Sequence, residues 1–350
     1  MTNNISFLIS DITNKGGTER MTVLLSNLLV TSNPTNNVEI FSLNDNNKKP
    51  FYSLNNDVKL EYGTGKKYKD LIYYFKKCKD ENFKVVVVSM GRLSFESSML
   101  ARIVSFKNIY LYEHVAIESF KLHIKLLKLL SFRLAKKIIV LTNNDCRLLK
   151  EKYNQKNIVC IPNINPYCHN LKDIKHIAQK SNIALAVGRY TKQKNFSELI
   201  DIWSKANIPN WKLYIVGDGP QRSELEALIK NNQTIKLLPS ISDIDKLYNK
   251  AKIYLMTSLY EGLPMVLIES QSFGLPAVSY DCPTGPNEII KENFSGFLIP
   301  QGETTLFTSK LIELIENENL LESFSNNAIE QSKQFSAEII LPKWLSLLEG

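Results

Sequence analysis

The sequence predicts an α/β protein with two doubly wound domains, each built on a parallel sheet. Short apolar runs alternate with segments of helical apolar spacing along most of the chain. The run Val85-Val86-Val87-Val88 is apolar without a break, which is typical of a strand covered by helices on both faces. Pro162, Pro166 and the polar residues up to Ser181 interrupt the alternation. At 350 residues the chain is long enough for about two domains, and we expect the linker at this interruption.

In the first half, a domain is expected over residues 1–165. Strands are expected over 5–10, 38–43, 85–90, 108–113, 137–142 and 157–161, and helices after Gly17 and over 68–82 and 97–106. The stretch 44–64 is rich in Asn and Lys, so we expect it to be irregular and exposed.

A second series of strands and helices predicts another domain over residues 178–335. Strands are expected over 183–187, 212–216, 235–238, 253–256 and 277–280, and helices over 197–206, 222–231, 243–251 and 264–273. Residues 303–330 are polar with helical spacing, and 336–348 have apolar helical spacing around Trp344.

Composition restricts the class of protein. The chain is 44% apolar and 22% charged, as in soluble globular proteins, and no apolar run reaches the roughly 18–20 residues of a membrane span. Its first residues lack the basic region and cleavage site of a signal peptide, so we expect a cytoplasmic protein. Five scattered cysteines without a C-x-x-C pair predict reduced packing residues. The net charge of +8 indicates an anionic partner, and nucleic acid is not expected because no nucleic-acid module is present.

The stretch from Tyr260 to Glu269 predicts an anion site at the edge of a sheet. A strand-like run leads through Gly262 into Pro264, a residue favoured at helix starts. Free N–H groups and the positive end of the helix dipole coincide at such a turn and bind phosphate. Glu261 and Glu269 flank it, and carboxylates accept hydrogen bonds from sugar hydroxyls. From these residues alone, a plain strand–helix joint with two surface acids is the alternative.

Another strand end carries Gly188, Arg189 and Lys194 on one loop. Arg as a planar fork and Lys as a point charge can clamp a diphosphate, although a chain with 43 basic residues also places such pairs by chance. Asp243 and Asp245 match a D-x-D metal pattern, but they follow Ser242 and are better explained as a helix start. We therefore expect no metal site.

Two features of the first half also follow strand ends. The pair Gly16-Gly17 would let backbone approach a ligand closely, but it lacks the third glycine of the dinucleotide fingerprint, and a bare tight turn is the alternative. His114 follows the strand expected over 108–113, where open α/β sheets place their ligands. A purely structural histidine is the alternative there.

The stretch 119–137 alternates leucines with cations and contains no acid. Its cations are Lys121, Lys125, Lys128, Arg133, Lys136 and Lys137. One interpretation is a helix with its leucines in the core and a solvated basic face. The other is an interfacial helix drawn to anionic lipid, in which each cation adds about 1 kcal/mol near the surface.

Glu261, seven intervening residues and Glu269, with Gly-Leu-Pro after the first acid, resemble the donor-sugar signature of retaining glycosyltransferases of family 4. The Gly188-Arg189 pair with Lys194 is similar to that family's pattern, except that Asn195 replaces its usual glycine. Gly217-Asp218-Gly219, Gly16-Gly17 and Glu113-His114 also stand where the family has similar residues. Residues 281–290 resemble a subgroup that builds bacterial surface polysaccharides and lipid-linked glycans. The resemblance covers nearly the whole chain.

This resemblance implies the GT-B fold, with two Rossmann-like domains facing across a cleft and a final helix, about 336–350, packing back on the first domain. It implies retaining transfer of a hexose or N-acetylhexosamine from a nucleotide diphosphate sugar, most often UDP-linked, without a metal or other cofactor. The implied acceptor is an oligosaccharide or a growing lipid-linked glycan of the O-antigen, lipopolysaccharide or capsule type. The implied place is the cytoplasm, with 119–137 a candidate contact to the anionic inner face of the membrane.

The resemblance also implies roles for single residues. His114, Glu261, Arg189 and Lys194 would carry catalysis, with Glu261 and His114 positioning the sugar and the two cations stabilising the leaving diphosphate. Glu269 would hold the ribose, and the loop at Pro239 the base. The implied donor-binding set also includes Gly16, Gly17, Gly188, Gly262, Leu263, Pro264, Met265 and Val266.

Two other classes of protein stay open at this point. One is a non-catalytic GT-B subunit that binds nucleotide and supports a partner enzyme. The other is a GT-B sugar-nucleotide epimerase, which would release or isomerise sugar without an acceptor.

Overall fold

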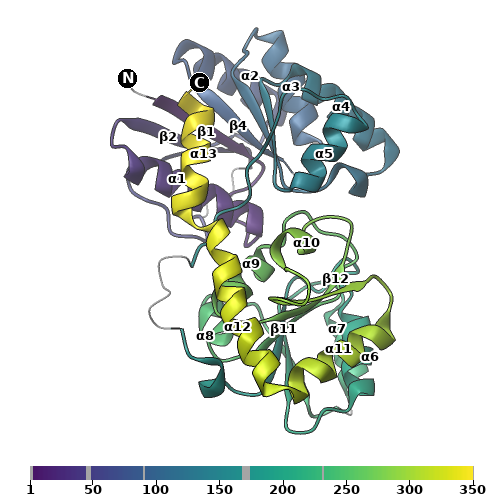
Figure 1. The fold of residues 1–350 in the computed structure, drawn as a ribbon. Helices are drawn as coiled ribbons and strands as arrows, with labels where there is room; N and C mark the ends of the chain where they lie inside the picture. Colours follow the sequence, from purple (N-terminus) through teal and green to yellow (C-terminus); the bar gives the residue numbers. More distant parts are fainter. Residues whose placement is uncertain (1–2, 45–48, 90, 168–173, 231, 350) are drawn as a thin grey trace. The chain divides into compact units, whose positions relative to one another are not determined.

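The computed structural model describes residues 3–44, 49–89, 91–167, 174–230 and 232–349, and the chain divides into two compact units (Figure 1). Unit 1 comprises residues 1–164 and 337–350, and unit 2 comprises residues 165–336. Each unit is a parallel sheet with helices packed on it, which confirms the predicted fold class of two doubly wound, Rossmann-like domains. Met90, Cys168 and the part of the expected linker over 168–173 lie outside the described residues.

The sheet of unit 1 has the strand order β3-β2-β1-β4-β5-β6-β7, with all pairs parallel. The strands are β1 (Asn3–Ile9), β2 (Asn36–Ser42), β3 (Lys59–Tyr62), β4 (Lys84–Ser89), β5 (Ile109–Glu113), β6 (Lys137–Val140) and β7 (Ile158–Cys160). The order changes direction between β1 and β4. In sheets of this kind, ligands bind at the carboxyl ends of the strands near such a point.

Helices cover both faces of this sheet. They are α1 (Gly17–Ser32), α2 (Lys67–Asp80), α3 (Leu93–Ile103), α4 (Leu122–Leu134), α5 (Asn143–Glu151) and α13 (Ala337–Glu349). α1 and α13 contact each other and β1 (Figure 1). Leu111 of β5 belongs to the core under α2, α3 and α4, whereas the ring of its neighbour Tyr112 packs edge-on against Trp344 of α13. Successive strand residues thus supply two separate cores.

The sheet of unit 2 has the strand order β10-β9-β8-β11-β12-β13, again parallel throughout. Its strands are β8 (Ile183–Val187), β9 (Lys212–Val216), β10 (Ile235–Leu238), β11 (Ile253–Met256), β12 (Ala277–Asp281) and β13 (Gly296–Pro300). Its helices are α6 (Phe196–Ala206), α7 (Arg222–Ile229), α8 (Ile244–Tyr248), α9 (Met265–Ser272), α10 (Pro286–Ile289), α11 (Thr304–Glu316) and α12 (Glu318–Ser332).

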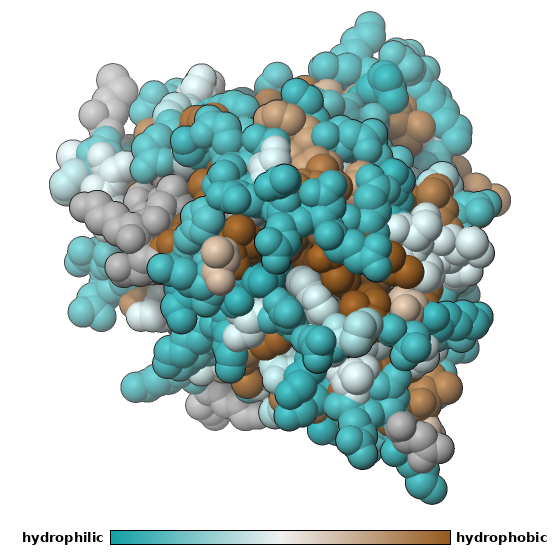
Figure 2. All heavy atoms as spheres, turned by 60° about the horizontal axis from the view of Figure 1, so that its bottom comes forward, coloured by the Kyte–Doolittle hydropathy of each residue, from teal (hydrophilic) through white to brown (hydrophobic). Residues whose placement is uncertain are grey.

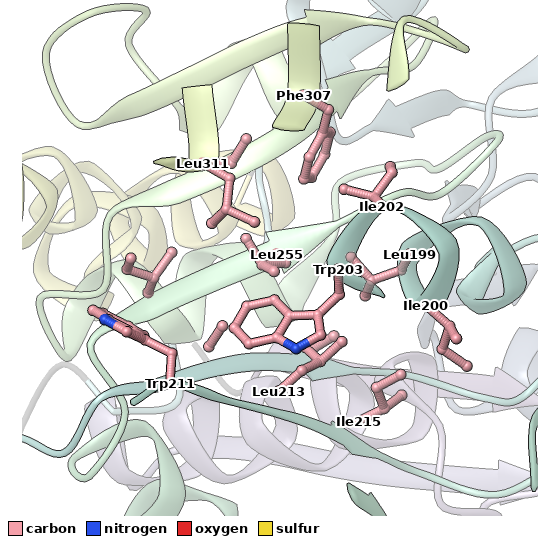
Figure 3. Close-up of a cluster of buried hydrophobic side chains, with 14 of the residues drawn as sticks. Leu199, Ile200, Ile202, Trp203, Trp211, Leu213, Ile215, Leu255, Phe307 and Leu311 are labelled. Atoms are coloured by element: carbon pink, nitrogen blue, oxygen red, sulfur yellow. The ribbon is translucent and has the colours of Figure 1, made fainter. Parts of the chain in front are cut away.

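One core of unit 2 forms where α6 and α11 meet the sheet (Figure 3). Trp203 of α6 lies beside Leu213 of β9, and Phe307 and Leu311 approach from α11. The indole Nε1 of Trp203 donates to Thr234 Oγ1 at 3.0 Å, so burial of the ring leaves its one polar atom satisfied. The same core includes residues of β8 and β11, the strands whose carboxyl ends carry the loops of the candidate site.

The prediction that 44–64 is irregular and exposed is wrong for Lys59–Tyr62. These residues form β3, which pairs in parallel with β2 at the edge of the sheet. An edge strand has one neighbour and need not be apolar, because charged side chains there protect the open edge. The sequence Lys-Leu-Glu-Tyr therefore lacks the apolar run by which the inner strands are recognised.

No helix within the described ranges is long and apolar enough to cross a membrane. Figure 2 shows a face on which hydrophilic side chains predominate, with apolar groups between them. Cys78, Cys146 and Cys282 are buried free thiols.

Candidate functional site

An ion pair joins two predicted site residues of unit 2. Lys194, on the loop after β8, places its Nζ 2.6 Å from Glu261 Oε1, on the loop after β11. Their side chains are only 16% and 8% exposed. β8 and β11 are neighbours in the sheet, so their carboxyl ends bring these two loops together.

Gly188 makes room for this lysine. A Cβ at Gly188 would lie 3.0 Å from Lys194 Cε and 3.1 Å from Cδ, so the aliphatic stem of Lys194 lies against bare backbone. The loops are tied by further bonds, since Leu259 N donates to Gln193 O at 2.8 Å and Thr257 Oγ1 to Asn195 O at 3.1 Å. Arg189 is exposed at the start of the same loop, and the described residues give its guanidinium no ion pair. It is therefore available for an anion.

The loop after β12 packs against the turn before α9 and is hydrogen-bonded to it. Thr284 Oγ1 donates to Glu261 O at 2.8 Å. Gly285 has φ +101°, and a Cβ there would lie 2.2 Å from Gly262 O and 2.6 Å from Pro264 Cδ. Position 285 therefore requires glycine for two reasons: its positive φ is rarely adopted by other residues, and there is no space for a Cβ atom.

α9 begins at Met265, with Pro264 at its N-cap. Pro264 O accepts from Leu267 N at 3.0 Å, and Leu263 and Pro264 are buried while Gly262, Met265 and Val266 are half-buried. The first amides of a helix have no partner within it and lie at the positive end of its dipole. The structure thus places the predicted turn directly beside the Lys194–Glu261 pair.

Glu269, one turn further along α9, is only 4% exposed. Tyr248 at the end of α8 donates its hydroxyl to Glu269 Oε2 at 3.0 Å. Burial raises the pKa of Tyr248 well above its ordinary value, and the charge of Glu269 adds to this shift. Tyr248 is consequently a constant hydrogen-bond donor, which fixes the orientation of the carboxylate.

Lys180 lies beneath both helices. Its Nζ donates to Phe273 O at 2.6 Å and to Tyr248 O at 3.2 Å, the carbonyls at the ends of α9 and α8. Burial, with a smaller contribution from Lys175, lowers the pKa of Lys180 to about 7. Pro239, the predicted base-side residue, is exposed after β10, where Leu238 O accepts from Gly217 N and Tyr190 Oη.

In unit 1, the pair Gly16-Gly17 starts α1. Gly16 is the N-cap, and Arg20 N donates to its carbonyl at 3.1 Å. The side chain of Glu19 folds back over Gly16, where a Cβ would lie 2.3 Å from Oε2. Gly17 is exposed at the first helical position.

His114 follows β5, at the carboxyl edge of the sheet of unit 1. Its amide donates to Ser89 O at 3.3 Å, and its ring lies 4.2 Å from the Tyr112 ring, centre to centre. Nε2 is buried and has no hydrogen-bond partner among the described residues. Burial, and then the charge of Lys128, lower the pKa of His114 to about 3, so the imidazole is neutral near pH 7.

α4 differs from the solvated basic face considered for 119–137 at Lys128, whereas Lys121 and Arg133 are exposed. Its most buried side chains include Lys128, which is 1% exposed, together with Ser131 and Phe132. Leu122, Leu126 and Leu130 are 71%, 58% and 45% exposed. The interpretation that the leucines fill the core and the cations are solvated is therefore wrong for these residues.

Four residues that hold the candidate site of unit 2 were not predicted from the sequence: Tyr248, Thr284, Gly285 and Lys180. The same is true of Lys128, which holds the segment of His114 in unit 1. Gly285-Pro286 follows a strand and is a turn signal, so its place could have been inferred. The others act through contacts between distant segments, which leave no local pattern. Among the described residues there is no group of three or more His, Cys, Asp or Glu able to hold a metal ion.

Residues 169–331 match the family model described as Glycosyl transferases group 1. The amylovoran biosynthesis glycosyltransferase AmsD of Erwinia amylovora is 37% identical over 352 residues, which cover 97% of this chain and 98% of AmsD. A Campylobacter jejuni alpha-1,4-N-acetyl-D-galactosaminyltransferase, whose name gives a PP-undecaprenol-linked glycan as its substrate, is 28% identical over 98% of both chains. A variant of Staphylococcus aureus TarM, solved with fondaparinux, alpha-GlcNAc-glycerol and UDP, has a TM-score of 0.83 and 16% identity, covering 99% of this chain and 100% of that one.

The two parallel-sheet units and their structural neighbours define the GT-B fold. The chain belongs to the glycosyl transferases group 1 family.

Proposed function

We propose that this glycosyltransferase works in bacterial polysaccharide biosynthesis. It moves a hexose or N-acetylhexosamine from a nucleotide diphosphate sugar, UDP-linked, to a growing lipid-linked glycan, with retention of the anomeric configuration. The relatives in Erwinia amylovora and Campylobacter jejuni support the pathway and the acceptor class, and the UDP complex of TarM supports the nucleotide.

The observation that carries this proposal is the pairing of Lys194 with Glu261 beside the start of α9. A lysine ammonium has three donors, and Glu261 uses one of them at 2.6 Å. The Glu261 carboxylate thus orients the Lys194 ammonium group and leaves two of its N–H donors for a phosphate. With Arg189 exposed on the same loop, two cations and a helix start converge on one anion.

Glu269 supports the nucleoside part of the donor. Its buried carboxylate, oriented by Tyr248, is the kind of group that accepts hydrogen bonds from the hydroxyls of a ribose. Glu261, at the other end of the turn, serves the sugar. The two acids would bind hydroxyl groups and the turn between them would bind phosphate, which fits a ligand that carries both.

In the reaction, the bond between the anomeric carbon and the β-phosphate oxygen breaks, and its electron pair leaves with the nucleoside diphosphate. The acceptor hydroxyl oxygen forms the new bond on the same face, and its proton passes to the departing phosphate or to solvent. Arg189, Lys194 and the α9 amides stabilise the charge that develops on the leaving group. Each well-placed donor of this kind contributes about 3–4 kcal/mol. The chemistry requires no metal in this scheme.

We also propose that unit 1 docks on an anionic membrane surface through α3 and α4, which pack together. Leu122, Leu126 and Leu130 are spaced four residues apart on α4, and Ile103 of α3 is 69% exposed. Exposed cations accompany them: Arg102, Lys107, Lys121 and Arg133. Apolar side chains framed by cations fit the boundary of a bilayer with anionic headgroups. In this proposal the enzyme lies on the cytoplasmic side of the membrane, next to a lipid-linked acceptor.

The donor is identified with a panel of UDP-glucose, UDP-galactose, their N-acetyl forms and GDP-mannose, each with and without a chelator. Chelator-insensitive turnover of one UDP sugar onto a lipid-linked acceptor, with an anomeric NMR coupling equal to that of the donor, is expected. An inverted product, strict metal dependence or turnover without acceptor would refute the mechanism. Nucleotide binding without any turnover would favour an accessory subunit instead.

Lys194→Ala and Glu269→Ala test the site itself. Each is expected to lower turnover about 100-fold or more, because a donor to the leaving group or the ribose contact is lost. Lys192→Ala is the control, since Lys192 is exposed on the same loop and is not assigned a contact. Full activity of either site variant would end the assignment.

Vesicle binding tests the docking face. Replacing Leu122, Leu126 and Leu130 by serine is expected to abolish co-sedimentation with phosphatidylglycerol vesicles. A matched variant carries Leu228→Ser and Leu306→Ser in unit 2, where the side chains are 51% and 38% exposed. The proposal fails if the α4 variant still sediments with the vesicles, or if both variants lose binding equally.

A further inference from the structure

A buried ion pair lies under the carboxyl ends of β4 and β5. Lys128 of α4 bonds Glu113 Oε2 through its Nζ, and the side chains of this pair are 1% and 5% exposed. Lys128 Nζ also donates to Ser94 Oγ at 3.1 Å and lies 4.9 Å from the centre of the Phe120 ring. Ser94 Oγ in turn donates to Glu113 Oε1 at 2.8 Å.

Stability alone does not explain why this pair is buried. Removing two charges from water costs several kcal/mol per ion, and apolar residues of similar volume often replace such pairs without loss of stability. What the pair does is connect four segments. Ser89 ends β4, Ser94 lies in the first turn of α3, Glu113 ends β5 and Lys128 is on α4, and Ser89 Oγ and Ser94 Oγ are 2.5 Å apart.

The segment that this network holds is the one that carries His114. Glu113 precedes His114, whose amide donates to the carbonyl of Ser89 in the same network. The backbone on both sides of the imidazole is therefore fixed by residues bonded to Lys128. Lys128 is the charged group that acts on the ring, Glu113 precedes it on β5, Tyr112 lies beside it, and Trp344 of α13 packs edge-on against Tyr112.

We infer that Lys128 is a positioning residue for His114, because its buried ion pair with Glu113 fixes the end of β5 and with it the place and orientation of the imidazole. The role of His114 toward the donor sugar rests on the proposed function. A transition state with a positively charged sugar ring favours a neutral hydrogen-bonding imidazole over a cationic one. Lys128 has two effects on His114: it holds the ring in place, and its charge disfavours protonation of the imidazole. Glu113 forms the ion pair that compensates the charge of Lys128.

The test removes both buried charges together, so that no charge is left unpaired. In the Lys128→Met/Glu113→Gln variant, we expect turnover to fall about tenfold or more, with the donor KM changed less than about threefold. Lys128→Arg, which keeps the charge, is expected to recover part of the turnover. The matched control is Lys77→Met/Glu39→Gln, which removes another Lys–Glu pair of unit 1, joined at 2.6 Å, away from His114. This control is expected to keep full turnover.

A second readout does not depend on activity. The chain has four histidines, so the ring resonances of His114 can be assigned in labelled protein by comparison with His114→Gln. In the wild type, these resonances should stay constant between pH 5 and 8 and carry the shift caused by the neighbouring Tyr112 ring, which is tilted by 57°. In the Lys128→Met/Glu113→Gln variant, that shift should change.

Unchanged ring resonances in this variant would overturn the inference, as would unchanged turnover. If the wild type transfers no sugar, the proposed function fails, but the resonances still decide whether Lys128 places the ring. If the control variant loses as much turnover as the Lys128 variant, the effect is general destabilisation and the inference is wrong.

Discussion

Glu269 is an acid that α9 removes almost completely from solvent, and its neighbours determine what it can bind. Tyr248 occupies one of its oxygens, and burial keeps that phenol protonated at any physiological pH. The sequence predicted the acid through its spacing from Glu261. It could not predict Tyr248, which lies on another helix and has no local pattern of its own.

Tyr248→Phe should weaken binding of the UDP moiety about tenfold. A hydrogen bond to a charged group contributes roughly 1.5–3 kcal/mol, and part of this is lost as Glu269 reorients. Calorimetric titration with UDP measures the effect. Tyr73→Phe, at an exposed position of unit 1, is the control and should bind UDP like the wild type. Equal affinity of Tyr248→Phe and the wild type would contradict the role given to Tyr248.

Gly285 and Gly302 separate two costs of replacing glycine. Both have positive φ, +101° and +86°, but a Cβ at Gly285 meets Gly262 O at 2.2 Å whereas nothing lies within 4 Å of a Cβ at Gly302. Gly302→Ala should lower the unfolding free energy by about 1–2 kcal/mol, the cost of the left-handed conformation. Gly285→Ala should cost clearly more and also weaken UDP binding, because it displaces the turn before α9. Denaturant unfolding and UDP titration of both variants check this, and equal behaviour would contradict it.

His114 predicts a pH dependence of stability with a definite sign. Its pKa falls from 6.5 to about 3 on folding, through burial and then Lys128. Between these values the unfolded chain binds a proton that the folded chain does not, so the unfolding free energy decreases as the pH falls. The slope from this group approaches about 1.4 kcal/mol per pH unit. His114→Gln should remove that slope between pH 6 and 4 in urea unfolding, and parallel curves for the two proteins would disprove the shift.

At the scale of elements, α4 shows what helical spacing alone cannot determine. Leucines and lysines alternate along it, so the pattern fits an apolar core face and equally an apolar outer face. The choice depends on Glu113, which lies outside the helix at the end of β5 and provides a buried partner for Lys128. A similar limit applies to β3, whose polar residues become a strand only because β2 has a free edge.

Lys180 links the ends of α8 and α9 in unit 2, so its replacement should affect both helices. Lys180→Met removes the donor to the carbonyls that end α8 and α9, so the helix ends that carry Tyr248 and Glu269 lose a partner. We expect a lower melting temperature and several-fold weaker UDP binding. Lys252→Met is a suitable control, since Lys252 is on the same unit but bonds Asn182 at an exposed position. UDP affinity equal to that of the control would contradict a role for Lys180 in the site.

At the scale of the whole molecule, the net charge of +8 and the leucines of α4 predict a two-part salt response. The electrostatic part of vesicle binding should weaken as the screening length falls from about 10 Å at 0.1 M to about 3 Å at 1 M salt. The apolar part should persist. Sedimentation across this range should therefore show a decline to a plateau above zero in the wild type. A decline to zero would mean that charge alone drives the binding.

The fold class could be predicted because doubly wound sheets leave a repeated signal, with apolar strands and helices alternating twice along the chain. The two acids around Gly262 were predictable because a strand–turn–helix joint is local. Residues 188–194 were predictable for the same reason. What could not be predicted is the support for these groups, because Thr284, Tyr248 and Lys180 each reach the site of unit 2 from another segment. In unit 1, Lys128 reaches the segment of His114 from α4 in the same way.

The packing of Trp344 against Tyr112 has a consequence for how the chain is made. Residues 1–164 of unit 1 are translated before unit 2, yet α13, which covers the sheet of unit 1 beside α1, is translated only after the whole of unit 2. For most of synthesis, Tyr112 and the adjacent face of β5 lack their final cover. During that time the growing chain carries an exposed aromatic surface, and a chaperone that shields it until α13 emerges would act on unit 1 and not on unit 2.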